Sequence, residues 1–274
     1  MPNTPLSRYK AIRTSRVDEF EHRLRAVYGA KRLTLTNPKG LQARGDFVQL
    51  QDIALCFGAC RTSATIDYGE TDFARLQLPL RGHGVSRSGT QTAAVGVGGA
   101  SLTSPGHPTT LEYGPDSEHI FVRIAPDALR RNLAMLLDAP VYRQPEFELV
   151  GFTNPEMLSG LRQMIRLLVQ QLNDEHSRLS PIAVREMEQA AIVQLLFTNR
   201  HSFSRLLERE PSNPASSHLR RAEAYIEANW NRPIAIEALA EVAGVSARSL
   251  FKGFAKTHGC TPMSFVKRVR LRHA

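Results

Sequence analysis

The sequence has few cysteines, no long apolar run and no acidic residue near its end. Only three of its 274 residues are cysteine, and Cys56, Cys60 and Cys260 are too unevenly spaced for a disulfide framework or a two-pair zinc site. The longest uncharged stretch, 88–111, contains five glycines and two prolines and cannot cross a membrane as a helix. No apolar segment of a signal peptide follows the basic residues near the N-terminus. These absences predict a cytoplasmic protein with reduced thiols and no membrane partner.

Acidic residues are scarce in the C-terminal part of the chain. The whole sequence has 35 Lys and Arg against 26 Asp and Glu, a net charge of +9. From residue 215 onward there are ten basic and four acidic residues, and from Ser246 onward seven basic residues and no acidic one. The basic excess therefore belongs mainly to the C-terminal segment, where it favours a polyanionic partner. The Pro- and Ser-rich stretch 211–217 precedes this segment and predicts a linker.

Residues 30–125 have the pattern of short strands separated by turns. Leu76, Leu78 and Leu80 alternate with other residues at the two-residue period of a half-buried strand. Closely spaced short strands with Gly- and Pro-containing turns predict a barrel or a sandwich. The other strands are expected over 48–57, 92–97, 100–103 and 119–124.

Residues 126–210 have the pattern of helices. Pro126 opens a helix that runs toward residue 138, and leucines and isoleucine recur every three or four positions between Leu158 and Leu172. A third helix starts at Pro181. Two amphipathic helices beside a small barrel pack on the barrel or form a dimer face, and the sequence leaves both open. The positions at helical spacing in the third helix are Ala183, Met187, Ala190, Ala191, Val193, Gln194 and Phe197.

The segment after the linker contains the pattern of a helix-turn-helix. Ala240 is a small residue where two helices can cross closely, and Gly244, four residues later, suits a left-handed turn. Leu250 then fills the crossing. Ser246 is a suitable N-cap for the second helix of the pair, and Ser217 for the helix that precedes the pair.

The second helix of this pair has a basic outer face. If Leu250 and Phe254 face the core, the opposite face carries Arg248, Phe251 and Lys252, with Lys256 further along. Near the start of a recognition helix, Arg can read guanine with two hydrogen bonds and Phe can contact a thymine methyl group. The alternative is an ordinary solvated charged face. The acid-free run and a further helix start at residues 261–262 favour DNA binding.

Five segments of the chain resemble the AraC/XylS family of bacterial transcription regulators. Residues 234–254 resemble the first helix-turn-helix of the family, and 259–272 resembles the start of its long connecting helix. Upstream, 76–82, 104–107 and 121–126 resemble the cupin-like sensor domain of XylS-type members.

The resemblance implies an α+β protein in two parts. Residues 1–210 are expected to form a cupin-like β-barrel with packed helices, which senses an effector and dimerises. Residues 211–217 are the linker, and 218–274 are an all-α DNA-binding segment with one helix-turn-helix.

The resemblance also implies a function and its residues. It implies a sequence-specific transcription regulator, an activator, that binds promoter DNA as a homodimer, responds to a small-molecule effector and works with RNA polymerase. At the matching positions it implies DNA contacts by Arg248, Ser249, Phe251, Lys252 and Lys256, with Ser249 on a phosphate.

XylS-type relatives suggest an aromatic acid as the effector, but the effector-binding residues are unknown from the sequence. Arg75, Arg81 or His83 could pair with a carboxylate, although we predict a surface position for each. Strand alternation does not say which face of the barrel lines a pocket.

Three features depart from the family pattern. The chain ends at Ala274, inside the segment that resembles the connecting helix, so we expect a truncated member with weaker and less specific DNA binding. Ala235 stands where a Ser or Thr cap is common, and Gly253 lies inside the recognition helix, each at a cost of about 1 kcal/mol. The alternative function is a non-activating member that dimerises with a full-length relative.

Motifs for catalysis are incomplete. His83, His107 and His119 occur singly, without the His-x-His pair of cupin metalloenzymes, and no Gly-x-Ser-x-Gly nucleophile motif is present. We therefore predict no enzymatic activity, no metal and no cofactor. A cupin-type metalloenzyme is the third alternative, which stoichiometric Fe or Zn in the purified protein would support.

Overall fold

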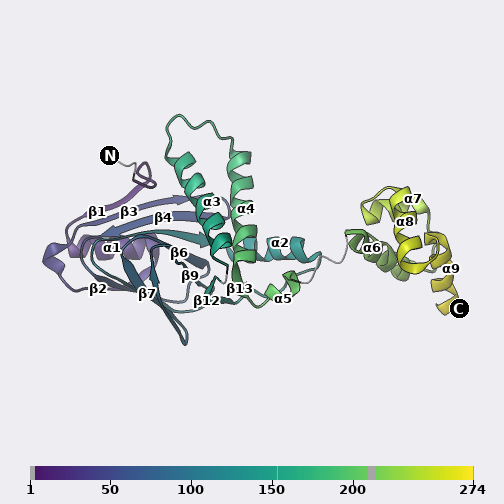
Figure 1. The fold of residues 1–274 in the computed structure, drawn as a ribbon, viewed down its shortest axis with the longest axis horizontal. Coiled ribbons are helices and arrows are strands. Elements are labelled where there is room, and N and C mark those ends of the chain that lie inside the picture. Colours follow the sequence, from purple (N-terminus) through teal and green to yellow (C-terminus); the bar gives the residue numbers. More distant parts are fainter. Residues whose placement is uncertain (1–3, 153, 209–213, 274) are drawn as a thin grey trace. The chain divides into compact units, whose positions relative to one another are not determined.

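The structure is a computed structural model that describes residues 4–152, 154–208 and 214–273 (Figure 1). Its contacts divide the chain into two compact units, Met1–Ser204 and Arg205–Ala274. We call them the barrel unit and the helical unit and describe each by itself.

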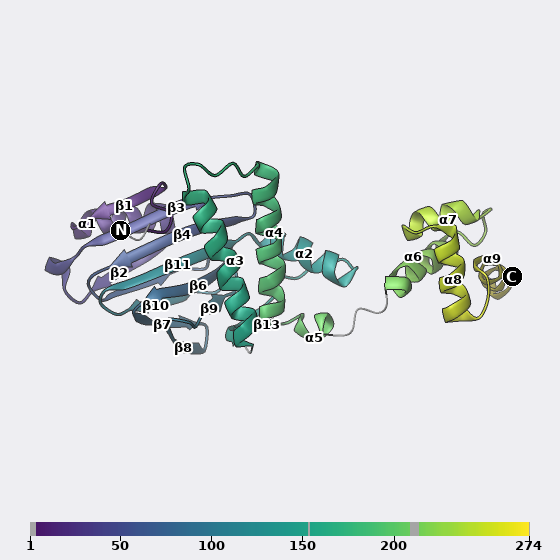
Figure 2. The same cartoon turned by 45° about the horizontal axis from the view of Figure 1, so that its top comes forward.

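The barrel unit is built on two antiparallel sheets (Figure 2). The first sheet has the strand order β1-β3-β4-β11-β6-β9, and the second has the order β2-β5-β10-β7-β8. The strands of the first are β1 (Lys10–Thr14), β3 (Ala43–Gln49), β4 (Ile53–Cys60), β11 (Ser117–Ile124), β6 (Ala74–Arg81) and β9 (Ser101–Thr103). The strands of the second are β2 (Ala30–Leu35), β5 (Ala64–Tyr68), β10 (Thr109–Tyr113), β7 (His83–Ser88) and β8 (Gln91–Gly96).

The core of this unit lies between the sheets and under helix α1 (Val17–Tyr28). Alternate residues of each strand point inward, so Cys56 of β4 and Phe121 of β11, which are paired in register, meet Ile66 and Leu111 from the opposite sheet. The inner face of α1 adds Phe20, Leu24 and Tyr28 to this core, and the helix ends at Gly29 in a left-handed conformation.

Four helices and a two-stranded sheet follow these strands in the described residues. They are α2 (Pro126–Leu137), β12 (Phe147–Phe152), α3 (Pro155–Asn173), α4 (Pro181–Thr198), β13 (Asn199–His201) and α5 (Ser204–Leu207). Arg162 of α3 donates to the carbonyl oxygens of Pro79 and Gly99, and buried Glu188 of α4 accepts from the backbone N–H groups of Asp52 and Ile53. These contacts attach α3 and α4 to the first sheet.

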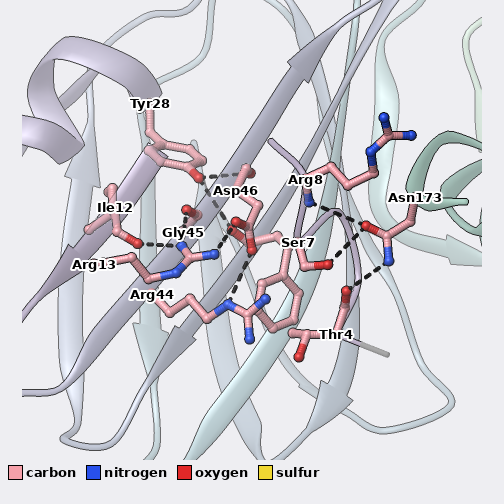
Figure 3. A network of polar contacts seen from close by, with 11 residues as sticks. Thr4, Ser7, Arg8, Ile12, Arg13, Tyr28, Arg44, Gly45, Asp46 and Asn173 are labelled. Atoms are coloured by element: carbon pink, nitrogen blue, oxygen red, sulfur yellow. Dashed lines mark hydrogen bonds and ion pairs between the residues drawn. The ribbon is translucent and has the colours of Figure 1, made fainter. Parts of the chain in front are cut away.

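The N-terminal arm is tied to the end of α3 (Figure 3). The Asn173 side chain accepts hydrogen bonds from Ser7 and from the backbone of Arg8, and it donates to the carbonyl of Thr4. The arm then enters β1, where Arg13 and Arg44 both pair with the buried carboxylate of Asp46.

The helical unit contains α6 (Pro214–Ala228), α7 (Ile236–Ala243), α8 (Ala247–His258) and α9 (Pro262–His273). All four helices bury apolar side chains in one cluster, which includes Leu219, Leu239, Leu250, Phe254 and Val266. The cluster holds the helices of the predicted helix-turn-helix, α7 and α8, against α6 and α9.

The structure confirms most of the expected strands and helices. Residues 92–97, 100–103 and 119–124 fall on β8, β9 and β11, and the helices opened by Pro126 and Pro181 are α2 and α4. The expected strand over 48–57 is wrong, because a turn at residues 50–52 divides it into β3 and β4. Buried Asp52 in this turn pairs with Arg131 of α2, a contact that the local sequence does not reveal.

Two predictions about exposure are also wrong. Strand β6 is buried on both faces from Ala74 to Pro79, because the core covers one face and α3 approaches the other. On α4, Ala190 and Phe197 are exposed, and the buried face instead carries Ile192, Leu195 and their neighbours.

Several segments were missed or misplaced by the sequence patterns. Strand β1 and helix α1 precede the expected start of structure at residue 30, and β12 lies within the segment expected to be helical. Residues 214–217 of the expected linker are helical, so α6 starts before the predicted cap at Ser217. The rest of that linker, 211–213, lies outside the described residues.

Candidate functional site

The turn between α7 and α8 has the geometry of a helix-turn-helix. Gly244 ends α7 in a left-handed conformation, with φ of +68°, and the N–H of Val245 bonds to the carbonyl of Ala240. Ser246 then caps α8 by accepting a hydrogen bond from the N–H of Ser249 at 3.3 Å. Leu250 is 1% exposed and fills the crossing, as its spacing predicts.

The outer face of α8 carries the five residues that the sequence singled out. Each of them is exposed: Arg248, Ser249, Phe251, Lys252 and Lys256. The three cations are spaced four residues apart, so they form one stripe along the helix. None of the three has an ion pair or hydrogen-bond partner within the parts of the chain that the structure describes.

Two arginines of α9, in contrast, have structural partners. Arg270 donates to the carbonyl oxygens of Trp230 and Arg232, and Arg272 pairs with Glu227 of α6 at 2.6 Å. The sequence grouped these cations with those of α8 as one basic run. The structure separates the unpaired stripe on α8 from the arginines of α9 that join helices.

Close packing explains why position 253 is a glycine, although glycine lowers the helix propensity of α8. A Cβ atom at this position would lie 3.1–3.4 Å from side-chain atoms of Leu219 on α6. The glycine therefore lets α8 approach α6 closely, which is the physical reason for a poor helix former inside α8.

Replacing Ala235 with serine is expected to stabilise the helical unit by about 1 kcal/mol. Ala235 is the N-cap of α7 and makes no side-chain capping bond, whereas a serine hydroxyl would accept one of the unpaired N–H groups. Urea unfolding followed by the fluorescence of Trp230, the single tryptophan, which packs on the helical core, measures the change. The control Ala224→Ser, inside α6, should be slightly destabilising. An unchanged midpoint for Ala235→Ser would contradict this account of the helix start.

A second candidate site is a small cavity inside the barrel unit. Its volume is about 50 Å³, room for about four waters. Its walls are mainly apolar and come from α1 and both sheets, with Tyr28, Ile66, Tyr68 and Phe121 among them. His119 and Ser117 of β11 also line it.

Several buried polar groups around this cavity lack hydrogen bonds. Among the described residues, no partner is found for the hydroxyls of Tyr113 and Ser117 or for either ring nitrogen of His119, all of which line the cavity. Nη1 and Nη2 of Arg75, which is not a lining residue but stacks on Tyr68 of the cavity wall, also lack a partner. Burial lowers the pKa of His119 to about 3, so its ring is neutral at pH 7. Unpaired buried polar groups are costly, and a cluster of them in one cavity is typical of a ligand site.

The structure corrects one prediction about this region and confirms two others. Arg75 is 4% exposed and lies inside the barrel unit, although a surface position was predicted. Arg81 and His83 are exposed, as expected. The sequence also missed Tyr113 and Ser117. Their only signal was strand alternation, which gives residues of one face but not the direction in which that face points.

An open, basic depression adjoins the cavity. It shares Arg44, Cys60 and Ser117 with the cavity lining, and it adds Arg61 and Arg81. Arg44 pairs with Asp46, and Arg61 lies 3.8 Å from Asp116. Much of the positive charge here is therefore already balanced within the protein.

No helix in the described ranges is long and apolar enough to span a membrane. In residues 4–152, 154–208 and 214–273, no three His, Cys, Asp or Glu side chains gather as a metal site would require.

Comparisons with known proteins agree with this architecture. The family model of the AraC-binding-like domain matches residues 20–197. The chain is 27% identical over 222 residues to the XylDLEGF operon transcriptional activator of Pseudomonas putida, covering 79% of this chain and 66% of that protein. It is 35% identical over 97 residues to the probable thc operon regulatory protein of Rhodococcus erythropolis, covering 35% of this chain and 29% of that protein. The chain thus spans about two thirds of the length of the Pseudomonas activator.

A solved structure, that of the AraC-like transcriptional activator CuxR, aligns with 88% of this chain and 85% of its own, at 15% identity and a TM-score of 0.46. The chain belongs to the AraC-binding-like domain family, and it is homologous to transcriptional activators of the AraC family.

Proposed function

We propose that this protein is a cytoplasmic, sequence-specific DNA-binding regulator that activates transcription in response to a small-molecule effector. Its partners are promoter DNA, the effector, a second copy of the chain and RNA polymerase. The observation that carries the proposal is the stripe of exposed, unpaired cations on α8, directly after the Gly244 turn. Residues at the start of such a helix can contact base edges, and its positive charge can bind phosphates.

The residues of the DNA interface have separate roles in this proposal. Arg248, in the first turn of α8, reads a guanine, and Phe251 contacts an apolar base edge. Ser249 and Lys252 bind a phosphate or a base near the same turn, and Lys256 binds a phosphate further along. Effector binding in the cavity of the barrel unit shifts the population of the state that binds DNA well.

The test is fluorescence anisotropy of the purified chain on the DNA upstream of its own gene and on a scrambled duplex, at two salt concentrations. Preference for the upstream DNA that persists at the higher salt supports a specific regulator. Equal binding to both duplexes with a steep salt dependence would leave only electrostatic attraction and would overturn the proposal.

Replacing Arg248 with alanine is expected to weaken binding to the preferred site by about 1–3 kcal/mol and to relax specificity at one base pair. The matched control is Lys256→Ala on the same stripe. It should weaken binding to all duplexes alike and reduce the salt slope by about one, because it removes one phosphate contact. Anisotropy titrations on single-base variants of the site measure both. Unchanged affinity of Arg248→Ala for the preferred site would refute its assigned role.

Replacing Leu167 with glutamate is expected to convert a dimer to a monomer. Leu167 of α3 is 50% exposed, and Ile182 and Phe197 of α4 are 72% and 46% exposed, so these helices carry three large apolar side chains outside the core. In this proposal the two helices pack on the barrel unit with one face and form the dimer with another. Analytical ultracentrifugation measures the mass. The control Val97→Glu changes an apolar residue that is 63% exposed in the β8–β9 connection and should leave the mass unchanged. A wild-type chain that is monomeric at micromolar concentration would remove the dimer from the proposal.

A further inference from the structure

Two side chains of α6 reach the end of α7, at the turn of the helix-turn-helix. Arg221 donates from Nη2 to the carbonyl oxygen of Ala243 at 2.8 Å, and Nδ1 of His218 lies 2.8 Å from the same oxygen. Nη2 of Arg221 also lies 2.7 Å from Nδ1 of His218, so the three groups meet at one point. The guanidinium lies against Gly244 as well, where a Cβ atom would be 3.6 Å from Nη2. We call the side chains of Arg221 and His218 the α6 cap.

The carbonyl that the α6 cap binds belongs to the last residue of α7. The last carbonyls of a helix have no partner within the helix, and Arg or His side chains near the C-terminus can bind them. Two earlier carbonyls of α7 are bonded within the turn itself, by the N–H groups of Gly244 and Val245. Ala243 is fully buried, so water cannot supply a partner for its carbonyl, and the α6 cap supplies one instead.

The position of Ala243 determines where α8 begins. Only three residues separate it from Ala247, the first residue of α8. Gly244 holds a left-handed conformation and Ser246 caps α8, so this short turn has little freedom to absorb a displacement. A displacement of Ala243 is therefore passed to Arg248 in the first turn of α8. Hydrogen bonds to base edges need closely defined geometry, whereas attraction to phosphates acts over longer distances.

We infer that Arg221, assisted by His218, is a positioning residue for sequence-specific DNA recognition. It fixes the end of α7, and thereby the orientation of the start of α8, without contacting DNA itself. This inference rests on the proposed function, because it concerns how the exposed stripe of α8 is presented to DNA. The far end of α8 is held to α6 separately, by the ion pair between His258 and Glu223. Removing the α6 cap should therefore disturb the start of α8 and leave its far end in place.

The test measures, by fluorescence anisotropy, how strongly the full chain prefers the upstream DNA over the scrambled duplex. Arg221→Met keeps the aliphatic part of the side chain and removes its donors and its charge. We expect it to lower the ratio of the two affinities by about fivefold or more, the loss expected when one base contact is displaced. The salt slope on the scrambled duplex should not change. Partial unfolding would reduce both apparent affinities by the same factor, so the ratio reports positioning rather than stability.

A matched control and two further variants separate position from charge. Arg220→Met removes the same charge from the neighbouring, exposed position of α6 and should leave the ratio within about twofold of wild type. Arg221→Lys, which keeps the charge and a donor, should recover most of the preference. His218→Ala should lower the ratio less than Arg221→Met, and the double variant no further than Arg221→Met, because both side chains act on one carbonyl. Equal losses for Arg220→Met and Arg221→Met, or a salt slope reduced by about one in Arg221→Met, would overturn the inference.

Hydrogen exchange in the turn separates a failed inference from a failed function. The N–H of Val245 bonds to the carbonyl of Ala240, and its exchange should be about tenfold faster or more in Arg221→Met, but unchanged in Arg220→Met. Unchanged exchange in Arg221→Met, or faster exchange with the DNA preference retained, would overturn the inference, while a preference in the wild-type chain leaves the proposed function standing. Equal binding of both duplexes by the wild-type chain would remove the proposed function, and this inference with it, whatever the exchange rate.

Discussion

Replacing Phe254 with alanine is expected to unfold a large part of the helical unit, whereas the same change at Phe251, three residues earlier on α8, should leave it folded. Phe254 is fully buried, and its ring packs at 5.4 Å between centroids on both His258 and Phe265. Removing a buried phenylalanine ring costs about 3–5 kcal/mol. A unit of this size, residues 205–274, has a total stability of only roughly 4–10 kcal/mol.

Phe251 is the matched control because it has the same side chain on the same helix. It is 40% exposed on the outer face, so its removal should cost less than about 1 kcal/mol of stability. Urea unfolding followed by Trp230 fluorescence measures both variants, since this tryptophan packs on the core of the helical unit. Phe254→Ala should lose DNA binding through unfolding, and Phe251→Ala through loss of a contact while folded. Equal unfolding midpoints for the two variants would show that the faces of α8 are wrongly assigned.

Lowering the pH from 7 to 5 is expected to destabilise the barrel unit by about 2 kcal/mol through His119 alone. Burial lowers the pKa of His119 to about 3 in the folded state, against about 6.5 in the unfolded chain. Between these values the unfolded chain binds a proton that the folded protein does not, so each pH unit below 6.5 favours unfolding by about 1.4 kcal/mol. The contribution of neutral His119 to folding stability is therefore present above pH 6.5 and declines as the pH falls toward 3.

The His119→Gln variant should lack most of this pH dependence. Urea unfolding at pH 7 and pH 5, followed by far-UV circular dichroism, gives the difference for each protein. Burial also lowers the pKa of His201. His201 therefore adds a further loss of stability as the pH falls, and His119→Gln keeps this loss. His83→Gln, at an exposed position of β7, is the control and should behave as wild type. An undiminished loss of stability in His119→Gln would disprove the assignment to this ring.

The two units differ in how far local sequence determines their structure. In the helical unit, residue spacing and residue type were enough to predict the exposed stripe on α8. Which side chains share a face of a helix depends on a short repeat along the sequence, and where the helix begins and ends depends on neighbouring residues. Gly244 takes the left-handed turn, Ser246 caps α8, and Leu250 is buried, as their types and spacing predict. The partners of Arg270 and Arg272 were not predictable, since they lie about 40 residues away in sequence.

In the barrel unit, the sequence by itself determined that short strands come first and helices follow, because strand period, turns and helix starts are local signals. Only the tertiary structure decided which side chains lie inside. Alternation along β6 puts Arg75 and Gln77 on one face and Leu76 and Leu78 on the other, and both faces are buried. A strand covered on both sides gives no hydropathy contrast, so a charged residue there looks like a surface residue until the opposite sheet and the helices are in place. The unpaired polar groups of Tyr113, Ser117 and His119 come from the consecutive strands β10 and β11, but no local pattern shows that they line one cavity.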